Sequence, residues 1–264
     1  MLQANRLVIG GTVLGCGLAM ADPAGTLLVE RGMVLGYDFS AALHEPACPE
    51  ATTPAGRELA DAMVEWGLLH DGRVHLPPVA DLLAARLHER NCRVLLYTDV
   101  LKIEAHNDGG WAVTLWNRDG MSTVAAEQIV DTTSEGVGHA LAQGVPLRKS
   151  FCGAMVATVS GAPAPEANEP ERWCCLRGAL PDELILKVAL PEDAGWPQAR
   201  QALHDTWAEL RGRGLARSWQ LGAEAGAIAH EYIAPINRAV GQSWRWRPSA
   251  SYGALMAAYE GRTA

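Results

Sequence analysis

The chain has 264 residues, of which 48% are hydrophobic and 20% are charged, and it carries a formal net charge of −8 at pH 7. This composition is typical of a globular protein, and the length allows one large domain or a domain with a smaller insertion. The negative charge disfavours nucleic acid and anionic membranes as partners, because both attract basic surfaces. The only candidate for a membrane span is interrupted by Asp22 and Pro23 before it reaches the required length of about 20 residues.

The first organised stretch runs from residue 6 to 31 and predicts a βαβ unit. An apolar strand over 7–9 leads into a glycine-rich turn and a short helix, and a second strand over 26–29 ends at Glu30. In units of this kind, glycines let the backbone approach a pyrophosphate, and the helix N-terminus faces its negative charge. The acid about 20 residues further on accepts a ribose hydroxyl. The stretch therefore predicts a dinucleotide site.

The glycine pattern departs from the usual fingerprint at its second position. The match is Gly10-x-Thr12-x-x-Gly15, so a β-branched side chain stands where the backbone should come closest to phosphate. We expect the Thr12 hydroxyl to donate to a phosphate oxygen there. A turn that is merely structural, in a fold that binds no nucleotide, is the alternative.

Residues 1–21 also have features of a secretion signal. Arg6 would be the charged region, residues 7–18 the apolar region and residues 19–21 a cleavage site, and residues 13–16 resemble a lipoprotein box. Against this alternative, there is a single positive charge, and glycines break the apolar run. The chain also continues directly into the strand and the acid that a nucleotide site requires.

The six cysteines predict buried thiols in a reducing compartment. They form no C-x-x-C pair and no cluster with zinc spacing. Cys174 and Cys175 are adjacent, and adjacent cysteines bridge only with strained geometry. We therefore expect no metal site and a cytoplasmic location.

The next segments predict two helices followed by an antiparallel meander. Apolar residues recur at helical spacing over 56–69 and again after the prolines at 77 and 78, up to Asn91. Three strand-like runs follow, over 93–104, 111–116 and 122–130, separated by turns that contain Asp-Gly. The last run ends in Asp131-Thr132-Thr133-Ser134-Glu135-Gly136.

This block resembles the core of the FAD-dependent oxidoreductases of the glutathione-reductase type. In that family the strand after the meander usually leads into Asp-Ala-Thr-Gly-Asp-Gly, and here Thr132 and Ser134 replace the Ala and the first Gly. The segment over 30–36, which contains Glu30 and Leu35-Gly36, matches as well. Residues 244–260 resemble the last FAD contact of the family, a turn of small residues that opens a helix. The chain is short for the family.

The resemblance implies an α/β fold: a Rossmann-like FAD-binding domain with a three-stranded antiparallel meander, and a smaller α+β substrate or cap domain. We expect the FAD-binding domain to comprise residues 1–148 and 230–264. Residues 149–229, with strands over 151–160 and 184–190 and a helix over 198–211, would form the cap. Trp244 and Trp246 share one face of a strand, which favours packing over ligand stacking.

The expected FAD contacts come from the fingerprint and from the resemblance. The fingerprint places Gly10, Gly11, Thr12 and Gly15 at the pyrophosphate and Glu30 at the adenosine ribose, with Arg31 beside it. The resemblance implies further contacts in the loop after Leu35, in the adenine pocket, near the phosphates and near the isoalloxazine. These contacts are Gly36 in the loop after Leu35, Val100 in the adenine pocket, Thr132, Thr133 and Gly136 near the phosphates, and Ser251, Tyr252 and Gly253 near the isoalloxazine.

Catalysis would need orientation, electrostatics and one base from the protein, since the flavin takes the hydride. His44 is the first candidate, because the segment after Leu35-Gly36 commonly lines the flavin pocket in the family, and histidine titrates near neutral pH. His230 and Tyr232 are second candidates. A polar loop residue for His44, and plain strand packing for the other two, are the alternatives.

The leading hypothesis is an FAD-dependent oxidoreductase that removes a hydride from a small organic substrate at an amine or hydroxyl carbon. Motifs for α/β-hydrolases, zinc proteases and P-loop ATPases are absent from the sequence, and no second nicotinamide fingerprint follows. The alternatives are a non-catalytic or partner-dependent flavoprotein-like subunit and an exported binding protein. The expected partner is a small-molecule substrate, and a homo-oligomer or a partner subunit is compatible with the short chain.

Overall fold

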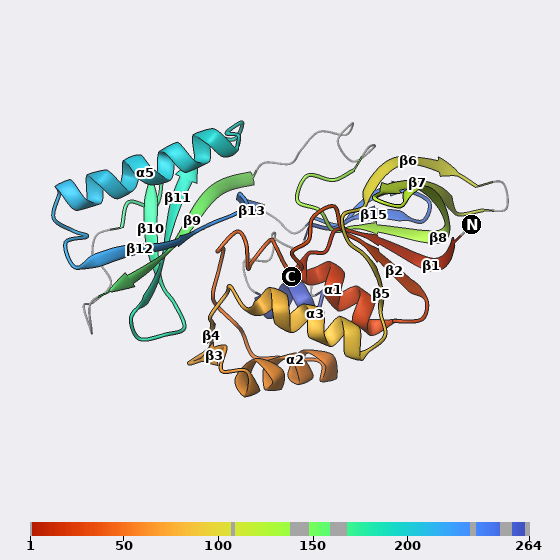
Figure 1. The fold of residues 1–264 in the computed structure, drawn as a ribbon, viewed down its shortest axis with the longest axis horizontal. Coiled ribbons are helices and arrows are strands. Elements are labelled where there is room, and N and C mark those ends of the chain that lie inside the picture. The colour runs from red at the N-terminus through yellow and green to blue at the C-terminus, as the bar shows by residue number, and fades with distance from the viewer. Residues whose placement is uncertain are drawn as a thin grey trace.

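The computed structural model describes residues 2–106, 109–137, 148–158, 168–232, 236–248 and 255–261. Figure 1 shows two lobes side by side, each built on its own β-sheet. One lobe holds both ends of the described chain, and the other is formed by its middle part. The fold is the mixed α/β architecture that the sequence predicts.

The first lobe is built on a parallel sheet. In the described part of the chain its strands lie in the order β15-β8-β1-β2-β5, and each neighbouring pair is parallel. The strands are β1 (Leu2–Ile9), β2 (Thr26–Val29), β5 (Arg93–Leu95), β8 (Gly120–Asp131) and β15 (Trp244–Trp246). An antiparallel strand, β14 (Arg238–Gly241), extends the sheet beyond β15.

Alternation along β1 separates two layers of apolar contacts. Leu7 and Ile9 face the meander formed by β6 (Asp99–Ala105), β7 (Trp111–Asn117) and β8. Val8 faces the helices on the other side. Successive side chains of a strand point to opposite faces, so one strand can support both layers. The first lobe therefore has three layers, with the parallel sheet in the middle.

The helical layer is formed by segments far apart in the chain. Its members are α1 (Val13–Ala21), α2 (Pro54–Glu65), α3 (Val79–Glu89) and α6 (Leu255–Tyr259). A small hairpin, β3 (Leu69–His70) with β4 (Arg73–Val74), follows α2. Glu260 accepts hydrogen bonds from the backbone N–H groups of Thr52 and Thr53, which attaches the end of α6 to the start of α2.

The second lobe is an antiparallel sheet covered on one face by a helix. Strand β9 (Arg148–Thr158) lies at its centre and pairs with β11 (Glu183–Leu190), β12 (Trp219–Glu224) and β13 (Ala229–Tyr232), and β10 (Trp173–Arg177) pairs with β11. Helix α5 (Trp196–Gly212) packs on one face of this sheet. Cys174 and Cys175 are neighbours on β10 and are both free thiols.

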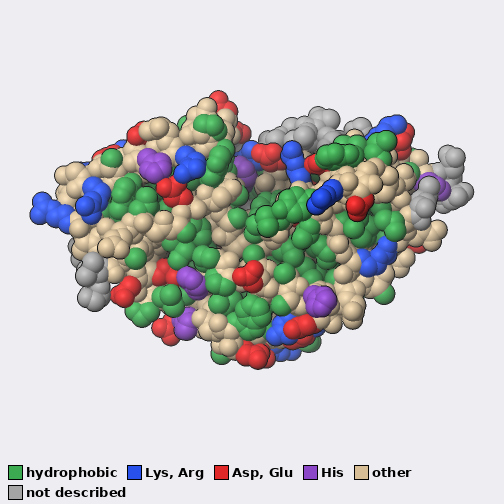
Figure 2. All heavy atoms as spheres, in the orientation of Figure 1, with side chains coloured by type: hydrophobic (Ala, Val, Ile, Leu, Met, Phe, Trp, Pro, Cys, Tyr) green, Lys and Arg blue, Asp and Glu red, His purple; other side chains and the backbone are tan. Residues whose placement is uncertain are grey.

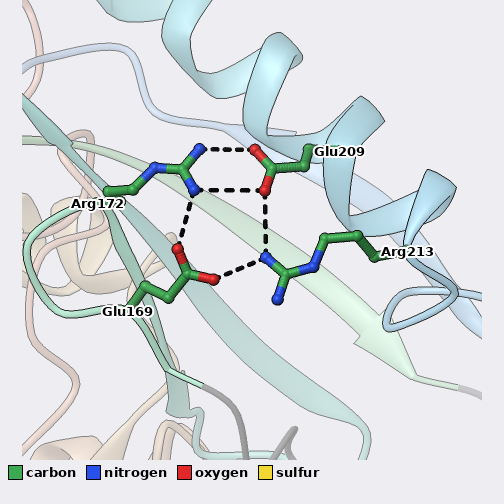
Figure 3. Close-up of polar contacts among 4 residues, drawn as sticks. All are labelled: Glu169, Arg172, Glu209 and Arg213. Atoms are coloured by element: carbon green, nitrogen blue, oxygen red, sulfur yellow. Dashed lines mark hydrogen bonds and ion pairs between the residues drawn. The ribbon is translucent and has the colours of Figure 1, made fainter.

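An exposed ionic network joins α5 to the segment before β10. Arg172 and Arg213 each contact both Glu169 and Glu209, which closes a ring of four side chains (Figure 3). The network draws the pKa of both carboxyl groups below the ordinary glutamate value, because each accepts hydrogen bonds from a guanidinium. Such a ring links α5 to the segment before β10 but adds little stability, since exposed ion pairs are weak.

Three sequence predictions need correction. The strand expected over 93–104 is divided into β5 and β6, because Tyr97 adopts a positive φ of 50° between them, a conformation that a strand cannot contain. The boundary at residue 230 also differs, because β13, with His230 and Tyr232, pairs with β9 in the second sheet. The helix expected over 56–69 ends earlier, at Glu65, and residues 69–70 form β3.

Residues 2–21 form the centre of the first lobe. Strand β1 pairs with β2 on one side and β8 on the other, and Val13, Leu14 and Cys16 of α1 are fully buried. Removal of this segment as a secretion signal would take out the middle strand of the sheet. Across the described ranges, no helix is long and apolar enough to cross a membrane.

The contact between α1 and α6 generates a prediction for Gly17. A Cβ at this position would stand 2.3 Å from the carbonyl oxygen of Tyr259, whereas a Cβ at Gly212 of α5 has no described heavy atom within 4 Å. We expect Gly17→Ala to lower the free energy of unfolding by about 1–3 kcal/mol relative to Gly212→Ala, because overpacking forces the two helices apart. Urea unfolding of both variants measures the difference, and equal stabilities would contradict the close packing.

Candidate functional site

A cavity of about 740 Å³ opens at the carboxyl ends of β1, β2 and β8. This is where open α/β sheets bind ligands. Three segments contribute most of its wall: the end of β1 at Ile9 and Gly10, residues 29–34 after β2, and residues 133–137 after β8. The volume lies within the range of about 300–1,000 Å³ that small-molecule sites occupy.

The glycine turn brings α1 against the end of β1. Gly10 has φ +102°, which side-chain-bearing residues rarely adopt. A Cβ at Gly15 would lie 2.2 Å from the carbonyl oxygen of Gly10. The fold therefore requires glycine at both positions: Gly10 makes the turn, and Gly15 allows the helix to approach the strand.

Thr12 does not direct its hydroxyl into the cavity. Its Oγ1 accepts from the Gly15 N–H at 3.1 Å, which caps α1, and donates to Thr132 Oγ1 at 2.7 Å. Thr132 in turn donates to the Gly10 carbonyl oxygen at 3.0 Å. Both threonines are buried. The expectation that the Thr12 hydroxyl binds a phosphate is therefore corrected, since this hydroxyl connects the glycine turn to the segment after β8.

Glu30 lies in the cavity wall at the end of β2. Its carboxylate accepts from the Gly11 N–H and from the Gly32 N–H, both at 2.5 Å, and its residue is 6% exposed. Burial raises the pKa of this carboxyl above the ordinary glutamate value, while the two backbone hydrogen bonds act in the opposite direction. Glu30 thus lies at the end of β2 with one carboxylate oxygen on the glycine turn and the other on the N–H group of Gly32.

A second carboxylate reaches the start of α1. Asp38 Oδ1 accepts from the Val13 N–H at 2.9 Å, and Asp38 is 5% exposed. Gly36, which has φ +63° and donates to the Gly11 carbonyl oxygen at 2.6 Å, turns the chain so that Asp38 can approach. Sequence reasoning missed Asp38, because its partner is 25 residues away.

The segment after β8 is organised by Asp131. Its carboxylate accepts from the Thr133 N–H at 3.0 Å, the Thr133 hydroxyl at 2.6 Å and the Val137 N–H at 2.5 Å. Burial raises the pKa of Asp131 to about 6, against which these three hydrogen bonds act. The result is a compact turn that presents Thr133 and Gly136 to the cavity.

The wall next to Glu30 is formed by the start of β6. Thr98, Asp99 and Val100 line the cavity there. Arg31 extends across its rim with 87% of its side chain exposed, and its Nε lies 3.1 Å from Asp99 Oδ1. Val100 and Arg31 therefore line the same cavity as Glu30.

The other end of the cavity is lined by residues that the sequence did not suggest. They are Tyr37, Ala41, Gly226 and Ala227. The Gly226 N–H donates to the Ala41 carbonyl oxygen at 2.7 Å, so the connection between β12 and β13 closes this end. The pKa of Tyr37 is raised well above its ordinary value by burial and by Glu30, Asp38, Asp131 and Glu135. No sequence pattern marks these four residues.

The three candidate catalytic residues lie outside the described lining of this cavity. His44 is fully buried, with Nδ1 3.8 Å from Glu231 Oε1. His230 Nδ1 lies 3.0 Å from Ser150 Oγ, and burial together with Arg148 lowers the pKa of His230 to about 4. The Tyr232 hydroxyl donates to the Ser134 carbonyl oxygen.

The predicted cofactor contacts divide into three groups. Those that line the cavity are Gly10, Glu30, Arg31, Val100, Thr133 and Gly136. Those that lie behind its wall and shape the turns are Gly11, Thr12, Gly15, Gly36 and Thr132. Those that lie outside the described residues are Ser251, Tyr252 and Gly253.

A known protein family matches most of this chain. A family model described as FAD dependent oxidoreductase matches residues 7–208. No curated protein matches the sequence. In the described ranges, no cluster of His, Cys, Asp or Glu is arranged to hold a metal ion.

Solved structures share the fold at low sequence identity. A geranylgeranyl bacteriochlorophyll reductase-like protein from Thermoplasma acidophilum has a TM-score of 0.66 and 12% identity over 98% of this chain and 76% of its own. L-proline dehydrogenase from P. horikoshii has a TM-score of 0.63 and 10% identity over 98% of this chain and 91% of its own. Aklavinone-11 hydroxylase, solved with FAD and aklavinone, has a TM-score of 0.61 and 14% identity over 98% of this chain and 60% of its own. The chain thus spans 60% of the length of that hydroxylase.

The lowered pKa of His230 predicts a pH-dependent stability. The pKa of His230 is about 4 in the folded protein and 6.5 for an unperturbed histidine, as in the unfolded chain. Between pH 4 and pH 6.5 the unfolded chain therefore binds a proton at this residue more readily than the folded protein does. Its contribution to stability is therefore complete above pH 6.5 and is lost as the pH falls toward 4. By linkage the loss is roughly 3 kcal/mol.

The test compares wild type with His230→Gln by urea unfolding across this pH range. Asp131 produces the opposite slope, because its raised pKa makes the folded state bind more protons. The contribution of Asp131 cancels in the difference between the unfolding free energies of the two proteins, since both retain Asp131. We expect wild type to lose stability relative to the variant on acidification, and a difference that does not change with pH would contradict a buried neutral His230.

Proposed function

Because the chain belongs to the family of FAD-dependent oxidoreductases, we propose that it binds FAD in the 740 Å³ cavity and uses it to oxidise a small organic substrate. The observation that carries this proposal is the position of Glu30. Its carboxylate stands in the cavity wall at the end of β2, beside the glycine turn that ends β1. An acid at this place is the ribose contact of dinucleotide-binding folds.

The residues of the cavity fit FAD at both the adenosine and the phosphate positions. Glu30 would hold the adenosine ribose, with Arg31 beside it and Val100 in the wall of the adenine pocket. The backbone of Gly10 and the turn over 133–136 would lie along the diphosphate. The lining includes both Val100 of β6 and Ala227 of the connection between β12 and β13.

FAD supplies the acceptor for the hydride that leaves the substrate. The protein would supply the proton acceptor, and His44 is the proposed base. It follows Ala41, which lines the cavity, by three residues, and its Nδ1 faces Glu231. Glu231 is 34% exposed on its side chain and lies 2.6 Å from Lys187 Nζ, so it offers a route for the proton to solvent.

His230 and Tyr232 support the site less directly. A pKa of about 4 keeps His230 neutral at physiological pH, so it would act as a hydrogen-bond partner. Tyr232 holds the Ser134 carbonyl oxygen and would position the turn beside the cofactor. We propose a small amine or alcohol as the substrate. The similarity to L-proline dehydrogenase supports an amine. Because the fold is also similar to that of a hydroxylase, a test must distinguish dehydrogenation from hydroxylation.

The proposal extends to the branch of the family and to the compartment. The strand–turn over 131–136 and the βαβ unit over 6–31 support the glutathione-reductase type. The six cysteines are all free in the structure, which supports the reducing environment of the cytoplasm.

A second candidate function is a flavoprotein subunit that requires a partner chain. Large apolar side chains are exposed on and beside the meander: Leu101 (56%), Trp116 (50%) and Met121 (76%). Figure 2 shows hydrophobic side chains in this part of the surface as well as across the middle of the same face. Exposed apolar surface of this kind marks interaction sites. A chain that binds FAD, but whose flavin no substrate reduces unless a second protein is added, would favour this candidate.

The position of Glu30 predicts the effect of removing its charge. We expect Glu30→Gln to weaken FAD binding about 10- to 100-fold, because hydrogen bonds from a hydroxyl to a charged acceptor contribute about 1.5–3 kcal/mol. Glu89→Gln, a change on the exposed end of α3, is the matched control and should bind as wild type does. Quenching of flavin fluorescence on titration with the protein gives the dissociation constants.

The same titration tests the proposed function itself. Wild type that leaves FAD fluorescence unchanged at all protein concentrations would contradict it. Where FAD binds, anaerobic loss of the visible flavin absorbance on adding amines or alcohols identifies the substrate class. If the flavin is reduced only by a nicotinamide dinucleotide, and oxygen is then inserted into the substrate, the reaction is a hydroxylation and the proposed dehydrogenation is contradicted.

A further inference from the structure

The turn after β8 contains the backbone N–H groups of Ser134 and Glu135, and both residues line the cavity. Neither N–H group has an acceptor among the residues that the structure describes. Their neighbours are satisfied within the turn, since Thr133 donates to Asp131 at 3.0 Å and Gly136 donates to Thr133 Oγ1 at 3.1 Å. Because a backbone donor needs an acceptor, these two N–H groups are available to an acceptor atom of a ligand in the cavity.

Two aromatic side chains hold the carbonyl groups of the same two peptide units. Trp246 Nε1 donates to the Thr133 oxygen at 2.8 Å, and the Tyr232 hydroxyl donates to the Ser134 oxygen. A trans peptide unit is planar, so its C=O and N–H groups point in opposite directions. The Thr133 carbonyl and the Ser134 N–H share one unit, and the Ser134 carbonyl and the Glu135 N–H share the next. Each aromatic donor therefore turns one of the two N–H groups away from itself.

The two aromatic donors lie together behind the turn. Their rings meet edge to face, with centroids 6.0 Å apart. Trp246 is fully buried and Tyr232 is 7% exposed, and neither is among the described residues that line the cavity. Because the donors are adjacent, both carbonyl groups point to one side of the turn and both N–H groups point to the other. Successive N–H groups arranged in this way form a concave site for an anion.

The charged side chains at the turn do not occupy these donors. Arg148 brings a positive charge, with Nη1 3.5 Å from the Ser134 oxygen and Nη2 3.8 Å from Glu135 Oε1. A guanidinium is always protonated in proteins, so it offsets the Glu135 carboxylate. Asp131 accepts three hydrogen bonds from the turn itself. The N–H groups are neutral donors, and their orientation depends on no protonation state.

We propose that Trp246 and Tyr232 are positioning residues that aim the N–H groups of Ser134 and Glu135 at the diphosphate of the bound dinucleotide. They act through the two peptide units and do not touch the ligand themselves. The inference rests on the proposed function, since the ligand is the FAD of that proposal. It gives Trp246 a part that packing alone does not require, because the indole N–H is needed as well as the apolar ring.

The experiment titrates the purified 264-residue apoprotein with FAD, ADP and riboflavin. Trp246→Phe keeps an aromatic ring and removes the indole N–H, and Tyr232→Phe removes only the hydroxyl. We expect each variant to weaken FAD and ADP binding about three- to tenfold, which is the effect of losing one hydrogen bond. Riboflavin binding should stay at the wild-type value, because riboflavin carries no phosphate. Flavin fluorescence reports FAD and riboflavin, and calorimetry reports ADP.

Trp244→Phe and Tyr259→Phe are the matched controls. Trp244 is fully buried on the same strand as Trp246 and packs in another part of the core. Tyr259 is 8% exposed, and its hydroxyl lies 3.7 Å from Met20 Sδ. Both controls should keep all three affinities at the wild-type values. Circular dichroism checks folding, and Tyr232→Phe, which removes a single oxygen atom, decides the result if Trp246→Phe does not fold.

The outcomes separate this inference from the proposed function. Unchanged FAD binding in either folded variant, with FAD binding intact in wild type, would overturn the inference and leave the function in place. Equal weakening of ADP and riboflavin binding, or a loss confined to riboflavin, would also overturn it, because the variants would then act on something other than the diphosphate. Absence of FAD binding in wild type would remove the inference and the function together.

Discussion

The close approach between α1 and the end of β1 is the constraint on which the rest of this structure depends. It exists because position 15 has no side chain, since a Cβ would lie 2.2 Å from the Gly10 carbonyl oxygen. With the helix in this place, Glu30 at the end of β2 accepts a hydrogen bond from the Gly11 N–H, and Asp38 at the end of the turn over 35–38 accepts one from the Val13 N–H. The cavity lies beyond these contacts, so its position follows from the packing of one glycine.

The same constraint reaches across the parallel sheet to the segment after β8. Thr132 donates to the Gly10 carbonyl oxygen, and Thr12 donates to Thr132. The carbonyl groups of Thr133 and Ser134, the two residues after Thr132, accept hydrogen bonds from residues much later in the chain. Trp246 Nε1 donates to the Thr133 oxygen at 2.8 Å, and the Tyr232 hydroxyl donates to the Ser134 oxygen. Strands of both lobes thus converge on one turn in the cavity wall.

The features that sequence reasoning predicted well are those encoded within a short stretch. The βαβ unit and the meander follow from apolar periodicity and from glycines that mark turns, and both are present, although β1 begins earlier than expected and the first strand of the meander begins only at Asp99. The features that it missed depend on partners far away in the chain. The Thr12 hydroxyl pairs with a residue 120 positions later, which no local pattern reveals. The assignment of β13 failed for a related reason, because an apolar run predicts a strand but does not say which sheet it joins.

Tyr232 illustrates how position changes the interpretation of a residue type. A tyrosine near a cofactor is a candidate for proton transfer, but burial raises the pKa of this hydroxyl, and the hydroxyl already donates to a backbone oxygen. Its ring meets Trp246 edge to face at 90°, and Trp246 holds the preceding carbonyl group. Two aromatic side chains from different sheets therefore fix adjacent peptide groups of the turn. Because this turn lines the cavity, movement of the second lobe relative to the first would change the shape of the cavity directly.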